Sequence, residues 1–131
     1  MSTVETMDRN EATLQLARAI AADTKLSALP WDDLVLVARF GEGVSNVNGF
    51  AYQAGGASRP AAPRGAAVLD AFIDLRAATA VDGQADWIAC KLHVRRAGGK
   101  LSLDFEYEQP DRWKISPANL KQMSEALRPT D

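Results

Sequence analysis

The chain has 131 residues, of which 47% are hydrophobic and 24% charged, with a formal net charge of -2 at pH 7. These values are typical of a single soluble globular domain, residues 1–131, that is large enough to bury a hydrophobic core. They exclude a broad basic surface for nucleic acid and a polybasic patch for membranes, and no apolar run approaches the roughly 20 residues of a transmembrane helix.

The first residues are polar and acidic, so we expect no secretion signal. Cys90 is the single cysteine of the sequence, which excludes an internal disulfide. Both features predict a cytoplasmic protein.

The first half of the chain predicts a helix followed by two strands. Residues from about Asp8 to Lys25 carry an amphipathic stripe, made of Met7, Leu14, Leu16, Ala17, Ile20, Ala21 and Thr24. The apolar run 34–40 predicts a strand covered on both faces, and 41–46 a turn. Residues 47–53 predict the returning strand, with Gly49 as a candidate bulge.

The stretch 54–63 is rich in Ala, Gly and Pro, which predicts a loop and makes it the best candidate for disorder. A second helix is expected over about 64–79, with Val68, Leu69, Phe72, Ile73 and Arg76 at helical spacing, and Asp82-Gly83 stops it. Ser116-Pro117 is a start signal for a last helix that carries Leu120, Met123 and Leu127.

Residues 86–113 contain the most regular pattern, in which apolar residues alternate along two arms around Gly98-Gly99. This pattern predicts a β-hairpin with a two-residue turn that pairs Ala97 with Lys100. The pairing places Val94 opposite Leu103 and Leu92 opposite Phe105 on the core face. On the outer face it places His93 opposite Asp104 and Lys91 opposite Glu106.

The element order α-β-β-α-β-β-α predicts an α+β domain. Its mostly antiparallel, four-stranded sheet is expected to have helices packed on one face.

The sequence lacks several signatures of catalytic sites. It has one histidine and one cysteine, and His93 and Cys90 point to opposite faces of the same predicted strand, so they form neither a local nucleophile–base pair nor a shared metal site. There is no phosphate-binding glycine loop and no dinucleotide fingerprint. We therefore expect no enzymatic activity, no catalytic residues, no metal and no cofactor.

An acidic row lies on the predicted outer face of the hairpin, at Asp104, Glu106 and Glu108. With Asp111 these carboxylates could serve acid–base hydrolysis or bind a hard metal ion. The simplest interpretation is a solvated strand face neutralised by Lys91, His93 and Arg95, with a partner-binding surface as the next alternative.

Three tryptophans and the cysteine complete the set of candidates. Trp87 is out of phase with the core face of its strand, so it is either covered by a loop or helix or exposed for a partner. Trp113 is expected to pack under the corner between strand and helix. Cys90 is expected to be a buried, inert thiol.

The order of residues also resembles a known family. Gly99-Lys100-Leu101-Ser102-Leu103-Asp104-Phe105-Glu106-Tyr107-Glu108-Gln109-Pro110, then Trp113, Asn119 and Leu127-Arg128-Pro129, is similar to the YezG-like family of bacterial immunity proteins. An earlier tryptophan followed by apolar strands also fits Trp31 with 34–40. The chain departs from the family pattern in being less acidic and in its Ala-, Gly- and Pro-rich stretch 55–63.

The resemblance implies a cytoplasmic immunity protein, or antitoxin. Such a protein binds the C-terminal toxin domain of a polymorphic or contact-dependent growth-inhibition system, often a nuclease, and blocks it. The family supplies no catalytic residue to transfer. The implied partner is thus a protein, with no direct nucleic-acid or membrane contact.

The leading hypothesis is stoichiometric toxin neutralisation, with Trp87 as an aromatic anchor and an acidic face that meets a basic groove. The expected partner-binding residues are Trp87, Lys91, His93, Asp104, Glu106, Glu108 and Asp111. Two alternatives remain: a small metal-assisted hydrolase or isomerase that uses the carboxylates of 104–111, and an adaptor or oligomer subunit with an exposed apolar patch. The oligomeric state stays open, with a monomer slightly favoured.

Overall fold

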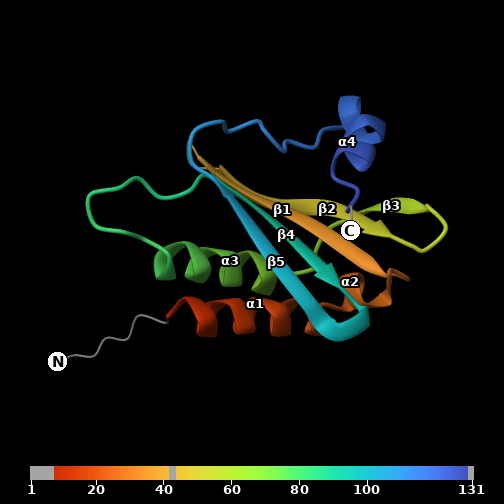
Figure 1. Ribbon diagram of the computed structural model, residues 1–131, viewed down its shortest axis with the longest axis horizontal. Coiled ribbons are helices and arrows are strands. Elements are labelled where there is room, and N and C mark those ends of the chain that lie inside the picture. Colours follow the sequence, from red (N-terminus) through yellow and green to blue (C-terminus); the bar gives the residue numbers. More distant parts are fainter. Residues whose placement is uncertain (1–7, 42–43, 130–131) are drawn as a thin grey trace.

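The computed structural model describes residues 8–41 and 44–129. Its centre is an antiparallel sheet with the strand order β3-β2-β1-β4-β5 (Figure 1). The strands are β1 (Asp33–Gly41), β2 (Val44–Tyr52), β3 (Ser58–Ala61), β4 (Ala89–Arg95) and β5 (Lys100–Glu106). The α+β class and the antiparallel sheet are confirmed, but the sheet has five strands and not four.

The additional strand, β3, lies in the stretch predicted to be a loop and possible disorder, and it pairs with β2. Its Pro60 hides the strand signal in the sequence, because proline lacks the N–H that a sheet needs. At the edge of a sheet a proline is tolerated, since one side of the strand makes no ladder. The prediction of disorder here was therefore wrong.

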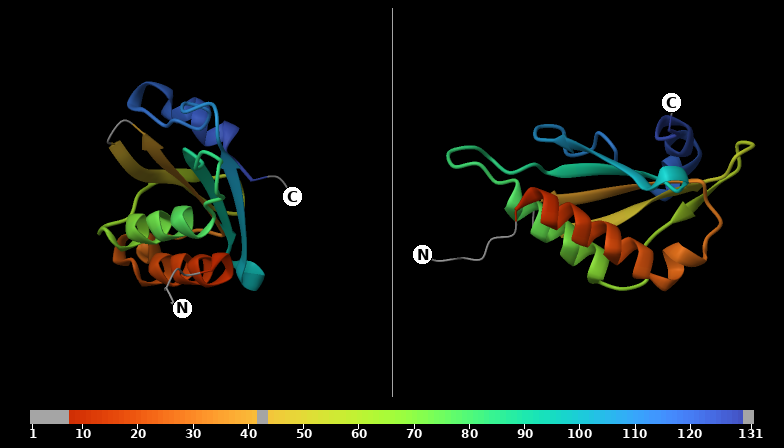
Figure 2. Two further views of the ribbon diagram at one scale, coloured as in Figure 1. Left: turned by 90° about the vertical axis from the view of Figure 1, so that its left-hand side faces the viewer. Right: turned by 60° about the horizontal axis from the view of Figure 1, so that its bottom comes forward.

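The sequence predicted helices on one face of the sheet, but they lie on both faces (Figure 2). Helices α1 (Arg9–Ala22), α2 (Thr24–Ala28) and α3 (Ala67–Ala78) lie on one side, and α4 (Leu120–Ala126) lies on the other. The sheet requires both covers, because the five consecutive residues 34–38 of β1 are all buried. The predicted burial of this strand on both faces is confirmed.

The first predicted helix is two helices. The carboxylate of Asp23 accepts the backbone N–H groups of Lys25 and Leu26, which ends α1 and starts α2. The buried line of α1 is Ala12, Leu16 and Ile20, whereas Leu14 is 50% exposed. Met7, the first residue of the predicted stripe, lies outside the described residues.

Two hydrophobic clusters hold the layers together. One lies between the sheet and α1 and α3, and includes Leu36, Phe72 and Trp87. The other lies on the α4 side and includes Phe50, Tyr52, Trp113 and Leu127. The predicted packing of Trp113 is confirmed, and the Tyr52 hydroxyl donates to the Ser124 carbonyl at 2.8 Å, which ties α4 to the sheet.

The start of the last helical segment is also confirmed. A 3-10 turn (Pro117–Asn119) precedes α4, and Ser116 caps it in a capping box with Asn119. The amide oxygen of Asn119 accepts the Ser116 backbone N–H at 2.8 Å.

The hairpin register differs from the prediction by two residues. Arg95 pairs with Lys100 across the four residues 96–99, where Gly98 and Gly99 adopt φ of 82° and 62°. Lys91 therefore lies opposite Asp104, His93 opposite Ser102 and Leu92 opposite Leu103. A shift of two preserves the face of every side chain, so the predicted core face is correct while the predicted pairs are wrong.

The predicted bulge is not at Gly49, because β1 and β2 pair without interruption. A Cβ at position 49 would lie 1.8 Å from the Val35 carbonyl oxygen, so glycine permits a close approach of the two backbones. An irregularity lies instead at the start of β4. Ile88 donates its N–H to the Glu106 carbonyl at 2.8 Å, although Ala89 is the residue paired with Glu106. Two residues opposite one constitute a β-bulge.

Within 8–41 and 44–129, no helix has the length and apolar character needed to cross a bilayer.

Candidate functional site

Trp87 belongs to the hydrophobic core, so its assignment as an exposed anchor was wrong. It is 1% exposed, and its ring stacks on that of Phe105 with centroids 5.3 Å apart. Its Nε1–H donates to the Thr79 hydroxyl at 2.8 Å, and its carbonyl accepts Arg76 Nε–H at 2.7 Å. The bulge at Ile88 explains the error, since it inverts the alternation of faces just before β4.

Lys91, His93 and Asp104 lie together on the outer face of the hairpin, as predicted, but with other partners. Lys91 Nζ lies 3.7 Å from an Asp104 carboxylate oxygen. His93 Nε2 lies 2.7 Å from Asp33 Oδ1, which also accepts Arg95 Nε–H at 3.0 Å. Burial raises the pKa of Asp33, but the hydrogen bonds with His93 and Arg95 outweigh it and hold that pKa below its usual value.

Lys91, His93 and Asp104 line a groove of about 290 Å³ between the hairpin and the end of α4, which we call the outer-face groove. It is completed by Val35, Ser102, Ala126, Leu127, Arg128 and Pro129. The groove is small and its charges are mutually neutralised, so it offers little net charge to a partner.

Glu106 supports the structure and is not available to a partner, which corrects its assignment to the binding face. It is 9% exposed, and Arg112 Nη1–H donates to its Oε1 at 2.8 Å. Its Oε2 accepts the backbone N–H groups of Glu108 and Gln109, both at 3.0 Å. The bond from Arg112 and those from the two backbone N–H groups lower the pKa of Glu106 to about 2.

Glu108 and Asp111 lie at the end of the sheet. Because β5 ends at Glu106, Glu108 is not on the strand face where it was predicted. Asp111 accepts Arg39 Nη2–H at 3.1 Å and keeps 71% of its side chain exposed. Both residues line a second groove, of about 570 Å³, whose other lining residues are Arg39, Phe40, Gly41, Asn46, Ile88, Pro110 and Lys114.

Two loops, 79–88 and 107–116, meet this end of the sheet, where the Ile88 N–H donates to the Glu106 carbonyl, and from there one runs toward α3 and the other toward α4 (Figure 1). Together they expose two large apolar side chains, Val81 at 55% and Tyr107 at 49%. Four exposed carboxylates accompany them. We call this set the loop-end surface, and it consists of Val81, Asp82, Asp86, Tyr107, Glu108 and Asp111.

Sequence reasoning missed Val81, Asp82 and Asp86. In the sequence Asp82 marks only the end of the second predicted helix, and neither aspartate lies in a periodic element that would mark a shared face. Their place at the same end of the sheet as Glu108 follows from the pairing of β4 and β5, because one loop enters β4 and the other leaves β5 there.

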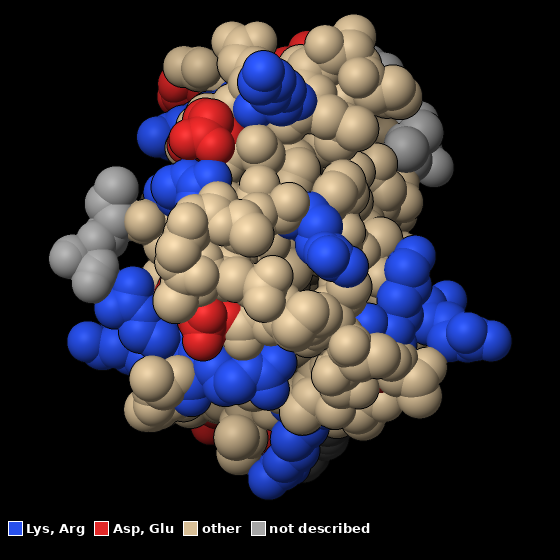
Figure 3. Space-filling model, turned by 90° about the vertical axis from the view of Figure 1, so that its right-hand side faces the viewer, with Lys and Arg blue, Asp and Glu red and all other residues tan. Residues whose placement is uncertain are grey.

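The opposite end of the molecule is rich in basic side chains. Figure 3 shows lysine and arginine side chains predominating there. Exposed basic residues of α2, β3 and the hairpin turn lie at this end, among them Lys25, Arg59, Arg96 and Lys100. The loop end also carries basic residues, Arg39, Arg112 and Lys114, so the separation of charge along the sheet is partial.

The carboxylates once considered for catalysis are dispersed. Asp104, Glu106 and Asp111 each bind a different basic side chain. Among the described residues, no three His, Cys, Asp or Glu side chains are grouped to hold a metal ion. Cys90 is fully buried as predicted, and burial raises the pKa of its thiol.

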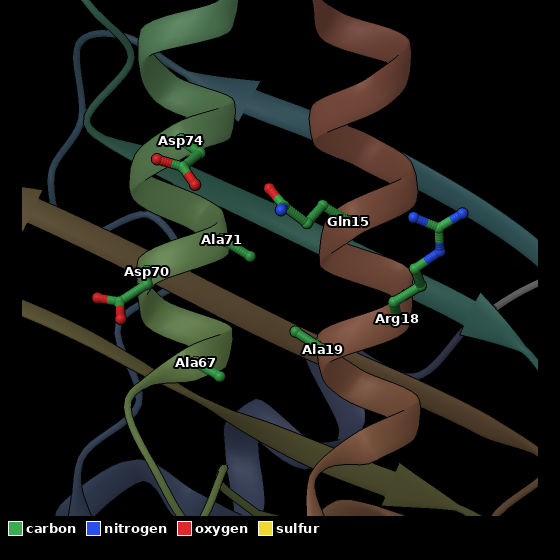
Figure 4. A pocket seen from close by; sticks show the side chains of 7 residues that line it. All are labelled: Gln15, Arg18, Ala19, Ala67, Asp70, Ala71 and Asp74. Atoms are coloured by element: carbon green, nitrogen blue, oxygen red, sulfur yellow. The ribbon is translucent and has the colours of Figure 1, made fainter. Parts of the chain in front are cut away.

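A further groove, of about 380 Å³, lies between α1 and α3. Figure 4 shows that alanines line its floor, that Gln15 points across it and that Asp70 and Asp74 point away from it. It lacks the convergent polar groups of a binding pocket, so we interpret it as a consequence of helix packing.

Comparison of the sequence with protein-family models gives no match, and comparison with curated proteins gives none either.

Proposed function

We propose that the protein is a cytoplasmic immunity protein that binds a toxin domain stoichiometrically through the loop-end surface. The class of partner comes from the resemblance of residues 99–129 to the YezG-like immunity proteins. The observation that supports this surface is that both loops at this end of the sheet carry exposed carboxylates together with an exposed apolar side chain, Val81 or Tyr107.

The chemistry of the surface suits a basic partner such as the substrate groove of a nuclease. Carboxylates at the rim accelerate association with a positive surface, and exposed apolar side chains supply area that is buried on contact. The basic opposite end would be repelled by the same groove, which favours approach by the loop end.

The bases of both loops are held before a partner arrives. Loop 79–88 is attached to the core by Trp87, and the start of the other loop is fixed by the bonds of Glu106 to Arg112 and to two backbone N–H groups. A surface that is ordered in advance loses less conformational entropy on binding, which favours tight complexes.

The decisive experiment is capture of the toxic C-terminal domain encoded by the open reading frame immediately upstream, followed by titration calorimetry. The double variant Asp82→Lys/Asp86→Lys should raise the dissociation constant about tenfold or more, mainly through slower association at low salt. The matched control is Asp70→Lys/Asp74→Lys, because these aspartates are also exposed but lie on α3. Equal affinity for both double variants would contradict the surface, and no capture at all would contradict the proposal.

The hydrolase hypothesis makes a different prediction. A site formed by Asp104, Glu106 and Asp111 should bind Mg²⁺, Mn²⁺ or Zn²⁺ and raise the melting temperature. The separate ion pairs of these carboxylates give that hypothesis no support. A clear thermal shift, lost on Asp104→Asn, would reverse this preference.

A further inference from the structure

The two edges of the sheet are unlike. The edge strand β3 has four residues, contains Pro60 and packs beside α4. The edge strand β5 has seven residues, contains no proline and pairs on one side only, with β4, in the described part of the chain. Natural sheets usually block an open edge, so an unblocked one marks a place where another strand can add.

The backbone of β5 shows which groups are open to such a strand. Glu106 turns its carbonyl toward β4, where it accepts the Ile88 N–H. Since these groups alternate in direction along a strand, Ser102 and Asp104 also bond toward β4. Leu101, Leu103 and Phe105 therefore direct their N–H and C=O groups outward, along the open edge.

A groove runs beside this edge. It has a volume of about 540 Å³ and lies between α1 and β5, with Leu14, Leu101 and Leu103 among its lining residues. Leu14 is half exposed although it lies in the middle of α1. An added strand would thus find apolar side chains next to open hydrogen-bonding groups.

The sequence of β5 is complementary to itself. In an antiparallel pair centred on Leu103, Leu101 faces Phe105 of a second copy, and Ser102 faces Asp104 of that copy. Lys100 lies opposite Glu106 of the second copy, whose carboxylate stays bound to Arg112, so this pair adds no ion pair and no like charges lie opposite each other. A shift that centres the pair on Asp104 would instead oppose two aspartates. The basic turn of one copy, with Arg96, would lie beside Glu108 of the other.

From this self-complementarity we infer that two copies of the chain pair through β5 into a symmetric dimer with a continuous ten-stranded sheet. The outward groups of three residues supply about six backbone hydrogen bonds across the axis. The Leu14 side chains of the two copies flank the junction. Asp82 and Asp86 lie in the loop before β4, which is not the strand at the dimer junction. The dimer therefore leaves this part of the loop-end surface exposed in both copies.

The test is the molar mass in sedimentation equilibrium at concentrations up to about 100 μM. The expected mass is twice the 14.1 kDa of one chain. Leu103→Pro should give monomers with an unchanged circular dichroism spectrum, because the lost N–H points outward and serves no bond to β4.

A second variant guards against misfolding of the first. Ser102→Asp, at an exposed position, opposes Asp104 of the second copy and should weaken the dimer about fivefold or more. The control is Ser58→Asp, also at an exposed position but on the other edge strand, which should leave the dimer unchanged.

Three results would overturn the inference. One is a monomer at all concentrations. Another is a dimer that survives both Leu103→Pro and Ser102→Asp, which would place the contact elsewhere. The last is a monomer whose capture of the toxin domain is abolished by Leu103→Pro, which would assign the edge to a strand of the toxin. Because the dimer is measured without any toxin, its failure leaves the proposed function standing, and the reverse also holds.

Discussion

Replacing Trp87 with alanine tests whether the loop-end surface rests on the core. A buried tryptophan removes about 150–250 Å² from water, which corresponds to roughly 4–6 kcal/mol at 25 cal/mol per Å² and somewhat less against a compact unfolded chain. The variant also loses the Nε1–H bond to Thr79 and the stacking on Phe105. Measured tryptophan-to-alanine changes in cores cost about 3–5 kcal/mol, and we expect that range here.

The assay is urea unfolding followed by circular dichroism, with the free energy of unfolding taken from linear extrapolation. The matched control is Tyr107→Ala, an aromatic truncation at a half-exposed position of the neighbouring loop, which should change stability by no more than about 0.5 kcal/mol. Trp87→Phe should fall between the two, because it keeps a ring and loses the donor. A cost below about 1 kcal/mol for Trp87→Ala would refute the buried position.

Three further substitutions probe the sheet and its covers. Gly49→Ala should destabilise the fold by more than about 2 kcal/mol in urea unfolding, because its Cβ would meet backbone, whereas Gly65→Ala, with open space around it, should be nearly neutral. Tyr52→Phe should cost about 0.5–1.5 kcal/mol in the same assay through the lost bond to α4, and no loss would contradict that bond. Glu106→Gln should flatten the acid limb of the stability profile. The pKa of Glu106 is lowered from 4.5 to about 2, so its contribution is complete above pH 4.5 and disappears as pH falls toward about 2; equal slopes for both proteins would contradict this.

The alternation of apolar residues along the hairpin could predict which face of the sheet each side chain is on, but not which residue lies opposite it on the other strand. Leu92 and Leu103 share the core face under either register, because a slip of two residues returns each side chain to its own face. The turn, however, sets the register, and Gly98-Gly99 fits both a two-residue turn and the observed four-residue connection. The charge pairing that favoured the shorter turn was therefore coincidental.

The position of the last helix could have been derived from the sequence. The run 34–38 predicted a strand buried on both faces, and a strand in the middle of a sheet needs cover on both sides. The three predicted helices were nevertheless assigned to one face. Helices α1, α2 and α3 cover that side, and α4 covers the other.

The candidate site was less predictable, because similar residues have different roles. Asp104 and Glu106 look equivalent in an alternating strand, yet Asp104 is exposed and Glu106 is buried under Arg112. That difference depends on a turn that returns the chain six residues later, and no periodic pattern encodes it. Trp87 likewise depends on a bulge with no glycine to mark it.

The bulge and Glu106 together connect the two halves of the loop-end surface. The carbonyl of Glu106 accepts the Ile88 N–H, which places Trp87 in the core and so fixes the end of loop 79–88. The carboxylate of the same residue accepts the Glu108 and Gln109 N–H groups, which starts the other loop. Since one residue orients both loops, the spacing between Asp86 and Glu108 is set by the sheet and not by the loops themselves. If the proposed function holds, sequence changes within either loop alter which partner is bound without disturbing the geometry of the loop ends.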